Sequence, residues 1–199
     1  MIYTQNQKDE PMYNREYQGD VCSHSHSFFL DNFIRKLIQN PRRIVGQYIE
    51  TGNTVIDLGC GPGFFSIAMA QMVGKEGKVY SVDLQPEMLD IVEKKAAKKN
   101  LTGRMIFHLC AQDTIGLEPE VKADFILAYY MVHETPDHAA FLGQVREVLK
   151  PGGRFLLVEP IFHVNRDHFN RITRDAEHAG LTVLGTPPGK GGRTLLLSK

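Results

Sequence analysis

The sharpest chemical signal in this 199-residue chain is a run of alternating glycines directly after a short apolar stretch. Gly59, Gly61 and Gly63 follow the strand-like residues 54–58 and precede the apolar helical sequence FFSIAMAQMV. Glycine lets the backbone turn tightly and approach a ligand closely. In an open α/β sheet, ligands bind at the carboxyl ends of the strands, where such a turn lies. The pattern therefore predicts a ligand-binding loop over residues 59–63.

Three kinds of cofactor loop compete for this pattern. The dinucleotide fingerprint G-x-G-x-x-G, started at Gly59, requires glycine at position 64, where the chain has Phe64. A P-loop requires G-x-x-x-x-G-K-[ST], which neither this turn nor the later Gly189-Lys190-Gly191 supplies. The NAD interpretation is weakened and ATP hydrolysis is excluded. The third kind of cofactor loop has the spacing D-x-G-x-G-x-G, and this is the spacing that the chain has from Asp57 onward.

Polar side chains follow the next strand-like runs. Asp83 ends the second run, about 20 residues after the last glycine, where an acid can accept hydrogen bonds from both ribose hydroxyls of an adenosine. Gln112 and Asp113 follow the third run, where they could either contact a ligand or cap a helix. Acid–base groups follow the fourth and fifth runs: His133, Glu134, Glu159 and His163. Carboxylate, amide and imidazole groups are therefore expected along one edge of a sheet.

The elements that must position these residues alternate along the chain. Strand-like runs alternate with amphipathic helical runs, and the strand-like runs are rich in Val, Ile, Leu and Phe without strict alternation. Such strands are buried on both faces, as in a parallel sheet between helices. Residues 28–38 and 45–49 predict two helices before the first strand, and LTVL and RTLLLSK around TPPGKGG predict a C-terminal hairpin.

Together these motifs resemble those of class I S-adenosylmethionine-dependent methyltransferases of the methyltransferase-domain, type 11/25-like kind. Besides the glycine loop, Ala128–Met131 matches the segment beneath the methionine part of the cofactor, and Val148–Phe155 matches the turn L-[KR]-P-G-G before strand five. The resemblance covers roughly residues 42–199. It implies an α/β, Rossmann-like doubly wound sheet of seven strands, mostly parallel with a C-terminal antiparallel hairpin, and helices on both faces.

The resemblance implies S-adenosyl-L-methionine as the cofactor and places it on this chain. Asp83 would bind the ribose, the Asp113 side chain and Gln112 backbone would reach the adenine, and Leu84 and Met88 would sandwich it. Asp57 would either support the loop or contact the methionine ammonium. The predicted cofactor-binding residues are Asp57, Gly59, Cys60, Gly61, Gly63, Phe64, Asp83, Leu84, Met88, Gln112, Asp113 and Tyr129.

In this fold class the residues after strands four and five lie over the cofactor's methyl group. The predicted catalytic and acceptor-pocket residues are therefore His133, Glu134, Glu159 and His163. A general base is needed only if the nucleophile carries a proton at the working pH. His133 could instead bind loop backbone, and Glu134 could cap the next helix.

Composition restricts the partners. The 23 basic and 23 acidic residues give a formal net charge of +0, so the broad positive field of a nucleic-acid or anionic-membrane binder is absent. The fourth strand ends in Ala128–Met131 rather than in [DNS]-P-P-[FYW], which disfavours base methylation. Residues 125–132, the longest strongly apolar run, fall short of the about 20 residues that a spanning helix needs. We expect a small-molecule acceptor, no nucleic acid and no membrane partner; a protein side chain is the alternative acceptor.

The N-terminus and the cysteines complete the picture. Residues 1–26 are polar and aperiodic, which predicts a flexible arm or lid ahead of a single domain at 27–199. Three cysteines cannot all pair and no secretory signal is recognisable, so a cytoplasmic location is expected. Cys22, His24 and His26 share a face but lack a fourth ligand of clear spacing, so no metal site is predicted. A non-catalytic cofactor-binding protein and a nicotinamide-dependent oxidoreductase are the alternative functions. The sequence does not indicate an oligomeric state.

Overall fold

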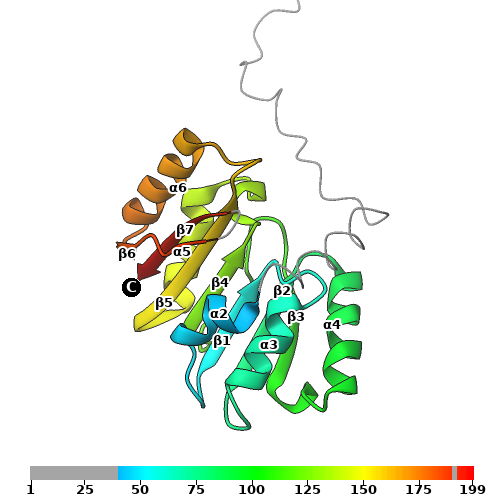
Figure 1. Cartoon of the computed structure of the whole chain (residues 1–199). Coiled ribbons are helices and arrows are strands. Elements are labelled where there is room, and N and C mark those ends of the chain that lie inside the picture. Colours follow the sequence, from blue (N-terminus) through cyan, green and yellow to red (C-terminus); the bar gives the residue numbers. More distant parts are fainter. Residues whose placement is uncertain (1–39, 190–191) are drawn as a thin grey trace, which may run out of the picture.

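A seven-stranded sheet with the order β3-β2-β1-β4-β5-β7-β6 forms the centre of the protein (Figure 1). The computed structural model describes residues 40–189 and 192–199. β7 pairs antiparallel with β5 and β6, and the other neighbouring strands pair in parallel. The strands are β1 (Thr54–Leu58), β2 (Lys78–Asp83), β3 (Met105–Leu109), β4 (Ala123–Tyr129), β5 (Leu149–Pro160), β6 (Thr182–Gly185) and β7 (Gly192–Ser198). The predicted fold class and C-terminal hairpin are confirmed.

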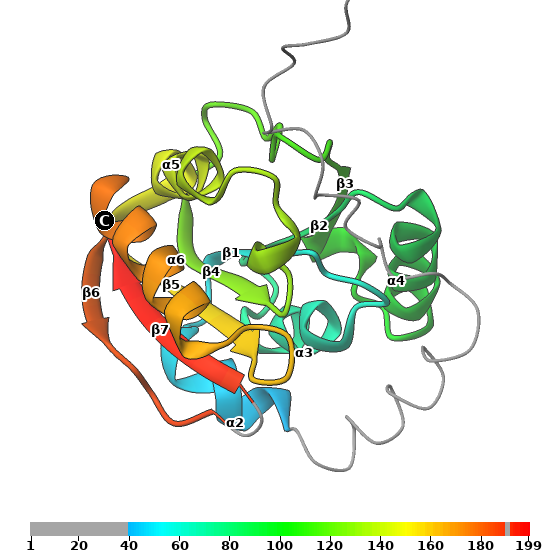
Figure 2. The ribbon, with the colours of Figure 1, turned by 90° about the horizontal axis from the view of Figure 1, so that it is seen from above.

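Helices cover both faces of the sheet (Figure 2). One face, here the α2–α4 face, carries α2 (Pro41–Val45), the short 3-10 helix η1 (Gly46–Tyr48), α3 (Phe64–Met72) and α4 (Pro86–Lys98). The other, the α5–α6 face, carries α5 (His138–Val148) and α6 (Arg166–His178). Two further 3-10 turns are η2 (Thr102–Arg104) and η3 (Val132–Glu134). The predicted arm at 1–26 and the predicted helix at 28–38 lie outside the described residues.

Burial on both faces explains the unbroken apolar runs. Along β4, Phe125 and Leu127 pack into the core beneath α2–α4, whereas Ile126 and Ala128 pack into the core beneath α5 and α6. Successive side chains of a strand point to opposite faces, so a strand covered twice has no polar side. β4 therefore lies at the centre of the molecule, with side chains packed beneath helices on both faces.

The amino ends of three strands are tied together by one carboxylate. Asp124, in β4, accepts a hydrogen bond from the Thr54 backbone N–H at the start of β1 at 2.8 Å. Both of its oxygens also accept from Lys150 Nζ at 2.8 Å. This cluster lies at the end of the sheet opposite the glycine loop.

The segment predicted as a turn before strand five lies inside β5. β5 begins at Leu149, which pairs with Ala123, and the register then shifts before Arg154 pairs with Phe125. Gly152 has φ of +73° within this irregular stretch. The turn-forming sequence at 150–153 therefore makes a bulge in a longer strand, since both of its flanks still pair with β4.

Among residues 40–189 and 192–199 no helix combines the length and apolar character needed to cross a membrane.

Tight packing before β2 gives a test of the fold. A Cβ atom on Gly77 would lie 2.4 Å from Val73 Cβ and 2.6 Å from the Val73 carbonyl oxygen. We expect Gly77→Ala to lower the free energy of unfolding by about 1–3 kcal/mol, because backbone must move to admit the methyl group. Urea denaturation measures the change. Gly103→Ala is the matched control, since nothing lies within 4 Å of its added Cβ; equal stability of the two variants would contradict the packing.

Candidate active site

The glycine loop connects β1 to α3 at the carboxyl end of the sheet. A Cβ on Gly59 would lie 2.9 Å from Met131, and one on Gly63 would lie 2.9 Å from Val92 of α4. These two glycines therefore let the loop pack against the segment after β4 and against α4. All three glycines have a positive φ, but Gly61 differs in that no atom of the described residues lies within 4 Å of an added Cβ. The loop is thus open at its middle, where backbone could approach a ligand.

Asp83 stands at the end of β2 and faces this loop. Its carboxylate is buried; Oδ2 accepts from the Gly61 N–H at 2.8 Å and Oδ1 from the Gln85 N–H at 3.0 Å. Burial raises the pKa of this carboxyl group, and the backbone hydrogen bonds oppose the rise. Each carboxylate oxygen can accept about two hydrogen bonds, so both oxygens retain accepting capacity. That arrangement suits a ligand with two neighbouring hydroxyl groups.

Asp57 is buried beneath the loop. The Ser66 hydroxyl, in the first turn of α3, donates a hydrogen bond to Asp57 Oδ2. Burial raises the pKa of Asp57 to about 7; the Ser66 hydrogen bond opposes this rise, and the negative charge of Asp83 adds to it. Asp57 therefore ties the end of β1 to the start of α3. Its support of the loop and its contact with a methionine ammonium stay predictions. Ser66 was not singled out from the sequence, although its place one turn after the loop is the signal that could have found it.

The segment after β3 lies beside Asp83. The Cys110 N–H donates to the Asp83 carbonyl at 3.0 Å, and Gln144 of α5 donates to the Asp113 carbonyl at 2.8 Å. Gln112 and Asp113 are exposed. The structure brings this segment to the edge that holds the glycine loop, as expected, because β3 is the next parallel strand outward. Contact of either residue with an adenine ring stays a prediction.

The start of α4 supplies further groups. Leu84 is exposed and Met88, in the first turn, is buried. Gln85 lies between them, and its Oε1 is buried without a hydrogen-bond partner among residues 40–189 and 192–199. A buried polar atom without a partner is unusual, so Gln85 is a candidate ligand contact. The sequence analysis missed it, because a glutamine before Pro-Glu reads as an ordinary helix start.

Aromatic rings connect the loop to the end of β4. The ring of Phe65 meets Phe64 edge-on, with centroids 5.1 Å apart, and packs on Tyr129 at 4.6 Å. Tyr129 in turn packs on Tyr130 at 4.3 Å. Cys60 is buried, and burial raises the pKa of its thiol far above the ordinary range, so it cannot serve as a thiolate nucleophile.

Tyr130 has a left-handed backbone. Its φ is +65°, and its N–H donates to the Val158 carbonyl at 2.7 Å. A Cβ on Gly192, opposite, would lie 3.2 Å from Tyr130 Cε1. A bulky residue in this conformation is strained, and such strain concentrates at functional sites. The sequence carries no signal for it, since backbone angles here depend on how β4 and β5 end.

The four predicted acid–base residues lie together at the carboxyl ends of β4 and β5. Glu159 was expected after the fifth strand, but it is the penultimate residue of β5, because β5 continues along β7 beyond the end of β4. Glu159 is fully buried and accepts hydrogen bonds from His133 Nδ1 and, at 3.3 Å, from the His133 backbone N–H. His133 Nε2 lies 3.9 Å from Glu134 Oε1, and the His163 ring lies 6.2 Å from the His133 ring. Asp137, rather than Glu134, caps α5, because its side chain accepts from the Ala140 N–H. Buried Glu159 is thus placed to orient His133, and direct contact of Glu159 with an acceptor stays a prediction.

Electrostatics favour a proton on the imidazole. Burial lowers the pKa of His133, but the hydrogen bond and the charge of Glu159, with a smaller contribution from Glu134, raise it above its ordinary value. With Nδ1–H donated to Glu159, Nε2 is the nitrogen that exchanges a proton with a partner. The pair can therefore accept a proton at one atom and stabilise the resulting imidazolium.

Metal ligation finds no support in the described ranges, 40–189 and 192–199, where no group of three or more His, Cys, Asp or Glu is arranged to hold an ion. The Cys22-His24-His26 motif lies outside them.

Comparison with known proteins decides the family. A sequence profile described as a methyltransferase domain matches residues 49–185. The chain belongs to the methyltransferase-domain family. Aklanonic acid methyltransferase DauC of Streptomyces sp. (strain C5) is 31% identical over 112 residues, which are 56% of this chain and 50% of that protein. Demethylmenaquinone methyltransferase of Geobacillus stearothermophilus is 30% identical over 111 residues, 56% and 47% of the two chains. The chain spans about half the length of these curated relatives.

Solved structures agree on the fold of this methyltransferase-family chain. An S-adenosylmethionine-dependent methyltransferase from Aquifex aeolicus superposes with a TM-score of 0.73 at 25% identity, covering 85% of this chain and 94% of that one. A second, from Methanococcus maripaludis, gives a TM-score of 0.68 at 22% identity, with 87% and 88% covered, and shows the fold alone. The predicted family and its cofactor, S-adenosylmethionine, are confirmed at this level.

The edge of the sheet that carries the glycine loop and Asp83 fits S-adenosylmethionine. In the described part of the chain, no atom lies within 4 Å of a Cβ added to Gly61 and the buried Gln85 Oε1 has no partner. The Asp83 carboxylate has accepting capacity for a diol. The residues present can therefore hold the nucleoside part of this cofactor. The contacts of the individual predicted residues stay predictions.

Removing the charge of Asp83 tests the ribose contact. We expect Asp83→Asn to weaken binding of S-adenosylhomocysteine by about tenfold or more, because a charge-assisted hydrogen bond is lost. Isothermal titration measures the affinity. Asp90→Asn, an exposed aspartate on α4, is the matched control and should bind as the wild type does. Equal affinities for the two variants, both folded, would remove Asp83 from the site.

The raised pKa of Asp57 has a consequence for stability. Between the ordinary pKa of an aspartate and about 7, the folded protein holds a proton that the unfolded chain has released. The free energy of unfolding should therefore fall as the pH rises through this window. Asp57→Asn cannot titrate, so its slope should be shallower, whereas Asp90→Asn should keep the wild-type slope. Urea denaturation from about pH 4 to pH 8 tests this linkage, and identical slopes for all three proteins would refute it.

Proposed function

We propose that the protein transfers a methyl group from S-adenosylmethionine to a small-molecule acceptor whose nucleophile carries a proton. The observation that carries the proposal is the hydrogen-bonded pair of His133 and Glu159 at the same edge of the sheet as the glycine loop and Asp83. A buried carboxylate paired with a histidine at the ligand-binding edge of the sheet supports a role in proton transfer, since burying a carboxylate is costly and such pairs cluster at functional sites. The names of two relatives, aklanonic acid methyltransferase and demethylmenaquinone methyltransferase, support a small acceptor.

The division of labour among the residues follows from their positions. When bound, S-adenosylmethionine supplies an electrophilic methyl group on a sulfonium. Methyl transfer is an in-line displacement, so the protein mainly aligns the reactants and excludes water. The glycine loop and Asp83 hold the donor side, and the aromatic cluster of Phe65, Tyr129 and Tyr130 keeps water from that side.

His133 removes the proton of the acceptor. Its Nε2 takes the proton, while Nδ1–H stays bonded to Glu159, which fixes the orientation of the ring and stabilises the imidazolium. Glu134 lies on the Nε2 side and favours the same charge. A hydroxyl, an enol or an acidic C–H group is the acceptor chemistry that needs such a base, whereas a thiolate needs little help.

The pH dependence of the rate tests this role. Formation of S-adenosylhomocysteine is measured on a panel of phenols, hydroquinones and enolic acids. We expect kcat/KM to rise with pH through the pKa of His133, because only neutral imidazole accepts a proton, and that pKa lies above its ordinary value. His133→Ala should lower kcat/KM by about 10²–10⁴-fold. Glu159→Gln should move the rise to lower pH, since the group that raises the pKa has lost its charge.

His178→Ala is the matched control, because His178 is exposed on α6 and should leave the profile unchanged. A His133→Ala protein with wild-type kcat/KM would exclude the base. Binding of S-adenosylhomocysteine with no product from the panel would favour the protein-side-chain or non-catalytic alternative instead.

A further inference from the structure

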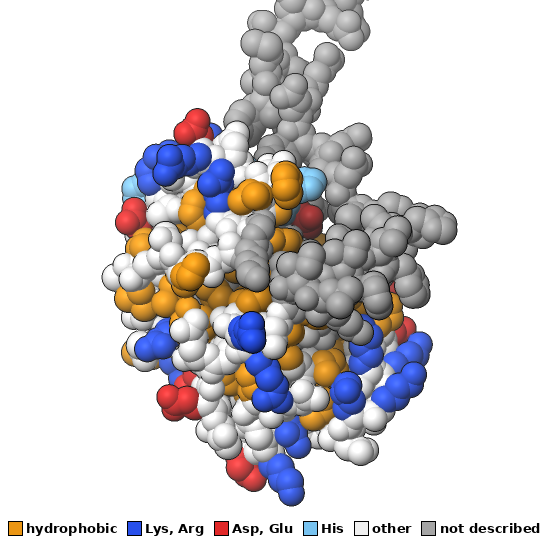
Figure 3. All heavy atoms as spheres, viewed as in Figure 1, with side chains coloured by type: hydrophobic (Ala, Val, Ile, Leu, Met, Phe, Trp, Pro, Cys, Tyr) orange, Lys and Arg blue, Asp and Glu red, His pale blue; other side chains and the backbone are white. Residues whose placement is uncertain are grey.

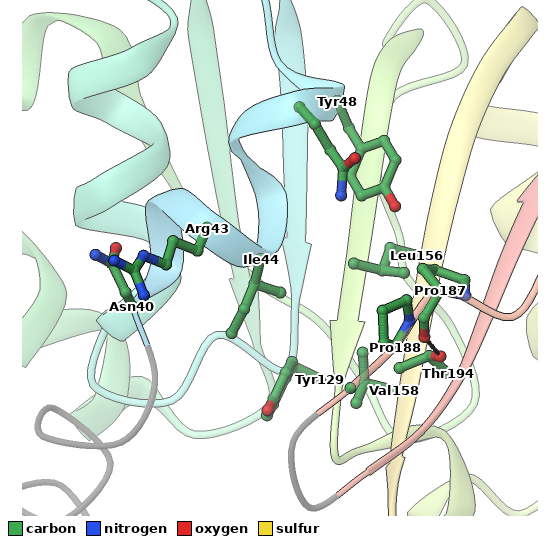
Figure 4. A pocket seen from close by; sticks show the side chains of 12 residues that line it. Asn40, Arg43, Ile44, Tyr48, Tyr129, Leu156, Val158, Pro187, Pro188 and Thr194 are labelled. Carbon is green, nitrogen blue, oxygen red and sulfur yellow. Dashed lines mark hydrogen bonds between the residues drawn. The ribbon is translucent and has the colours of Figure 1, made fainter.

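A cavity of about 280 Å³ opens on the α2–α4 face of the sheet, next to the carboxyl end of β4 (Figure 4). Its walls come from α2 and η1, from the strands β4, β5 and β7, and from the segment that precedes β7. We call it the α2 cavity. Its described lining residues are Asn40, Arg43, Ile44, Gln47, Tyr48, Tyr129, Leu156, Val158, Pro187, Pro188, Gly189 and Thr194.

The wall is apolar with a single charge. Tyrosine, proline and branched aliphatic side chains line most of it, and Arg43 is the one charged residue among the described lining residues. Figure 4 shows Arg43 beside Asn40 at the α2 end, next to Ile44. Within the described chain no carboxylate lies within salt-bridge distance of Arg43. Figure 3, which views the molecule from the side of Figure 1, shows apolar side chains gathered across the middle of this face with basic ones around them.

The α2 cavity adjoins the candidate active site through shared residues. Tyr129 lines the cavity and packs on Phe65, which lies in the first turn of α3 directly after the glycine loop. Val158 also lines it, and the Val158 carbonyl accepts the N–H of the strained Tyr130. The cavity therefore reaches the carboxyl ends of β4 and β5 from the α2–α4 face, next to the aromatic cluster of Phe65 and Tyr129.

We propose that the α2 cavity binds the ring system of the methyl acceptor, and that this acceptor is an aromatic acid whose negative group pairs with Arg43. The inference rests on the proposed function and specifies its acceptor. An apolar wall with a small number of polar groups is the usual composition of a small-molecule site. Here Arg43 is exposed at the rim of the cavity, where its guanidinium lies beside Asn40 (Figure 4). The volume is just below the roughly 300–1,000 Å³ of drug-sized sites, which suits a compact ring system rather than a long chain. Because the described lining carries one guanidinium and no carboxylate, an anionic ligand is complementary and a cationic one is not.

Three probes with the same ring and different charge test the inference: 1-naphthoate, 1-naphthalenemethanol and 1-naphthylmethylammonium. Each is titrated calorimetrically into the full chain, with and without saturating S-adenosylhomocysteine. We expect the naphthoate to bind most tightly and the ammonium least. Arg43→Gln should weaken naphthoate binding by about tenfold, because a charge-assisted hydrogen bond is lost, and should leave the alcohol unchanged. Arg42→Gln, the neighbouring exposed arginine outside the cavity, should change neither.

Filling the cavity supplies an independent variant. Gln47 lines it from η1 and is exposed, so Gln47→Trp should admit the indole ring and weaken binding of all three probes. Gln71→Trp, an exposed glutamine of α3 outside the cavity, is the matched control and should bind the probes as the wild type does.

Titration of the same proteins with S-adenosylhomocysteine separates the two proposals. If S-adenosylhomocysteine binds but the naphthoate does not, or if Arg43→Gln weakens the alcohol as much as the naphthoate, the assignment of the α2 cavity is wrong and the proposed function is untouched. The same holds if both Trp variants bind the probes equally. If no variant or wild-type protein binds S-adenosylhomocysteine, the proposed function fails, and with it the assignment of the cavity to an acceptor.

Discussion

The hydrogen bond from the Gly61 N–H to the Asp83 carboxylate joins the two loops from which the site is built. Three other contacts hold the same loop: the Cys60 N–H extends the pairing of β1 by donating to the Val82 carbonyl at 3.0 Å, Lys95 of α4 donates to the Pro62 carbonyl at 2.6 Å, and Gly63 packs on α4. The loop is therefore fixed to a neighbouring strand and to a helix. A ligand that meets a fixed loop loses little free energy to ordering it, so binding free energy is available for the reacting groups.

The residues at the carboxyl ends of β4 and β5 are also fixed by their neighbours. Tyr129, the last residue of β4, pairs with Val158, and β5 continues through Glu159 and Pro160 along β7. The segment after β4 therefore lies beside the last residues of β5. The buried Glu159 would be costly as an isolated charge, and His133 supplies the partner that offsets the cost. The turn that carries His133 to this position passes through the left-handed Tyr130. Strain at one residue thus accompanies the placement of a base opposite a carboxylate, which is where backbone strain is commonly tolerated.

The sequence could predict what depends on order along the chain. Alternating runs predicted the sheet and its helices, and the glycine spacing predicted the loop. His133 and Glu159 could be expected together because the carboxyl ends of parallel strands meet at one edge. The pairing of Asp57 with Ser66, the unpartnered Gln85 oxygen and the backbone of Tyr130 could not be predicted, since each depends on packing depth or on local register. The α2 cavity could not be predicted for another reason: its walls come from segments as far apart as Asn40 and Thr194, and no short motif links them.

The cluster of Asp124, Thr54 and Lys150 gives the opposite end of the sheet a separate role. It fastens three strands at their amino ends, far from the loops that face a ligand. Replacing one of these residues should lower the fraction of folded protein in a cell, whereas replacing a residue of the α2 cavity should alter which acceptor is used. The two ends of the sheet can thus diverge under different selective pressures. Substitutions at the amino ends act on stability and hence on the amount of folded protein, whereas substitutions near the cavity can change specificity without altering the fold.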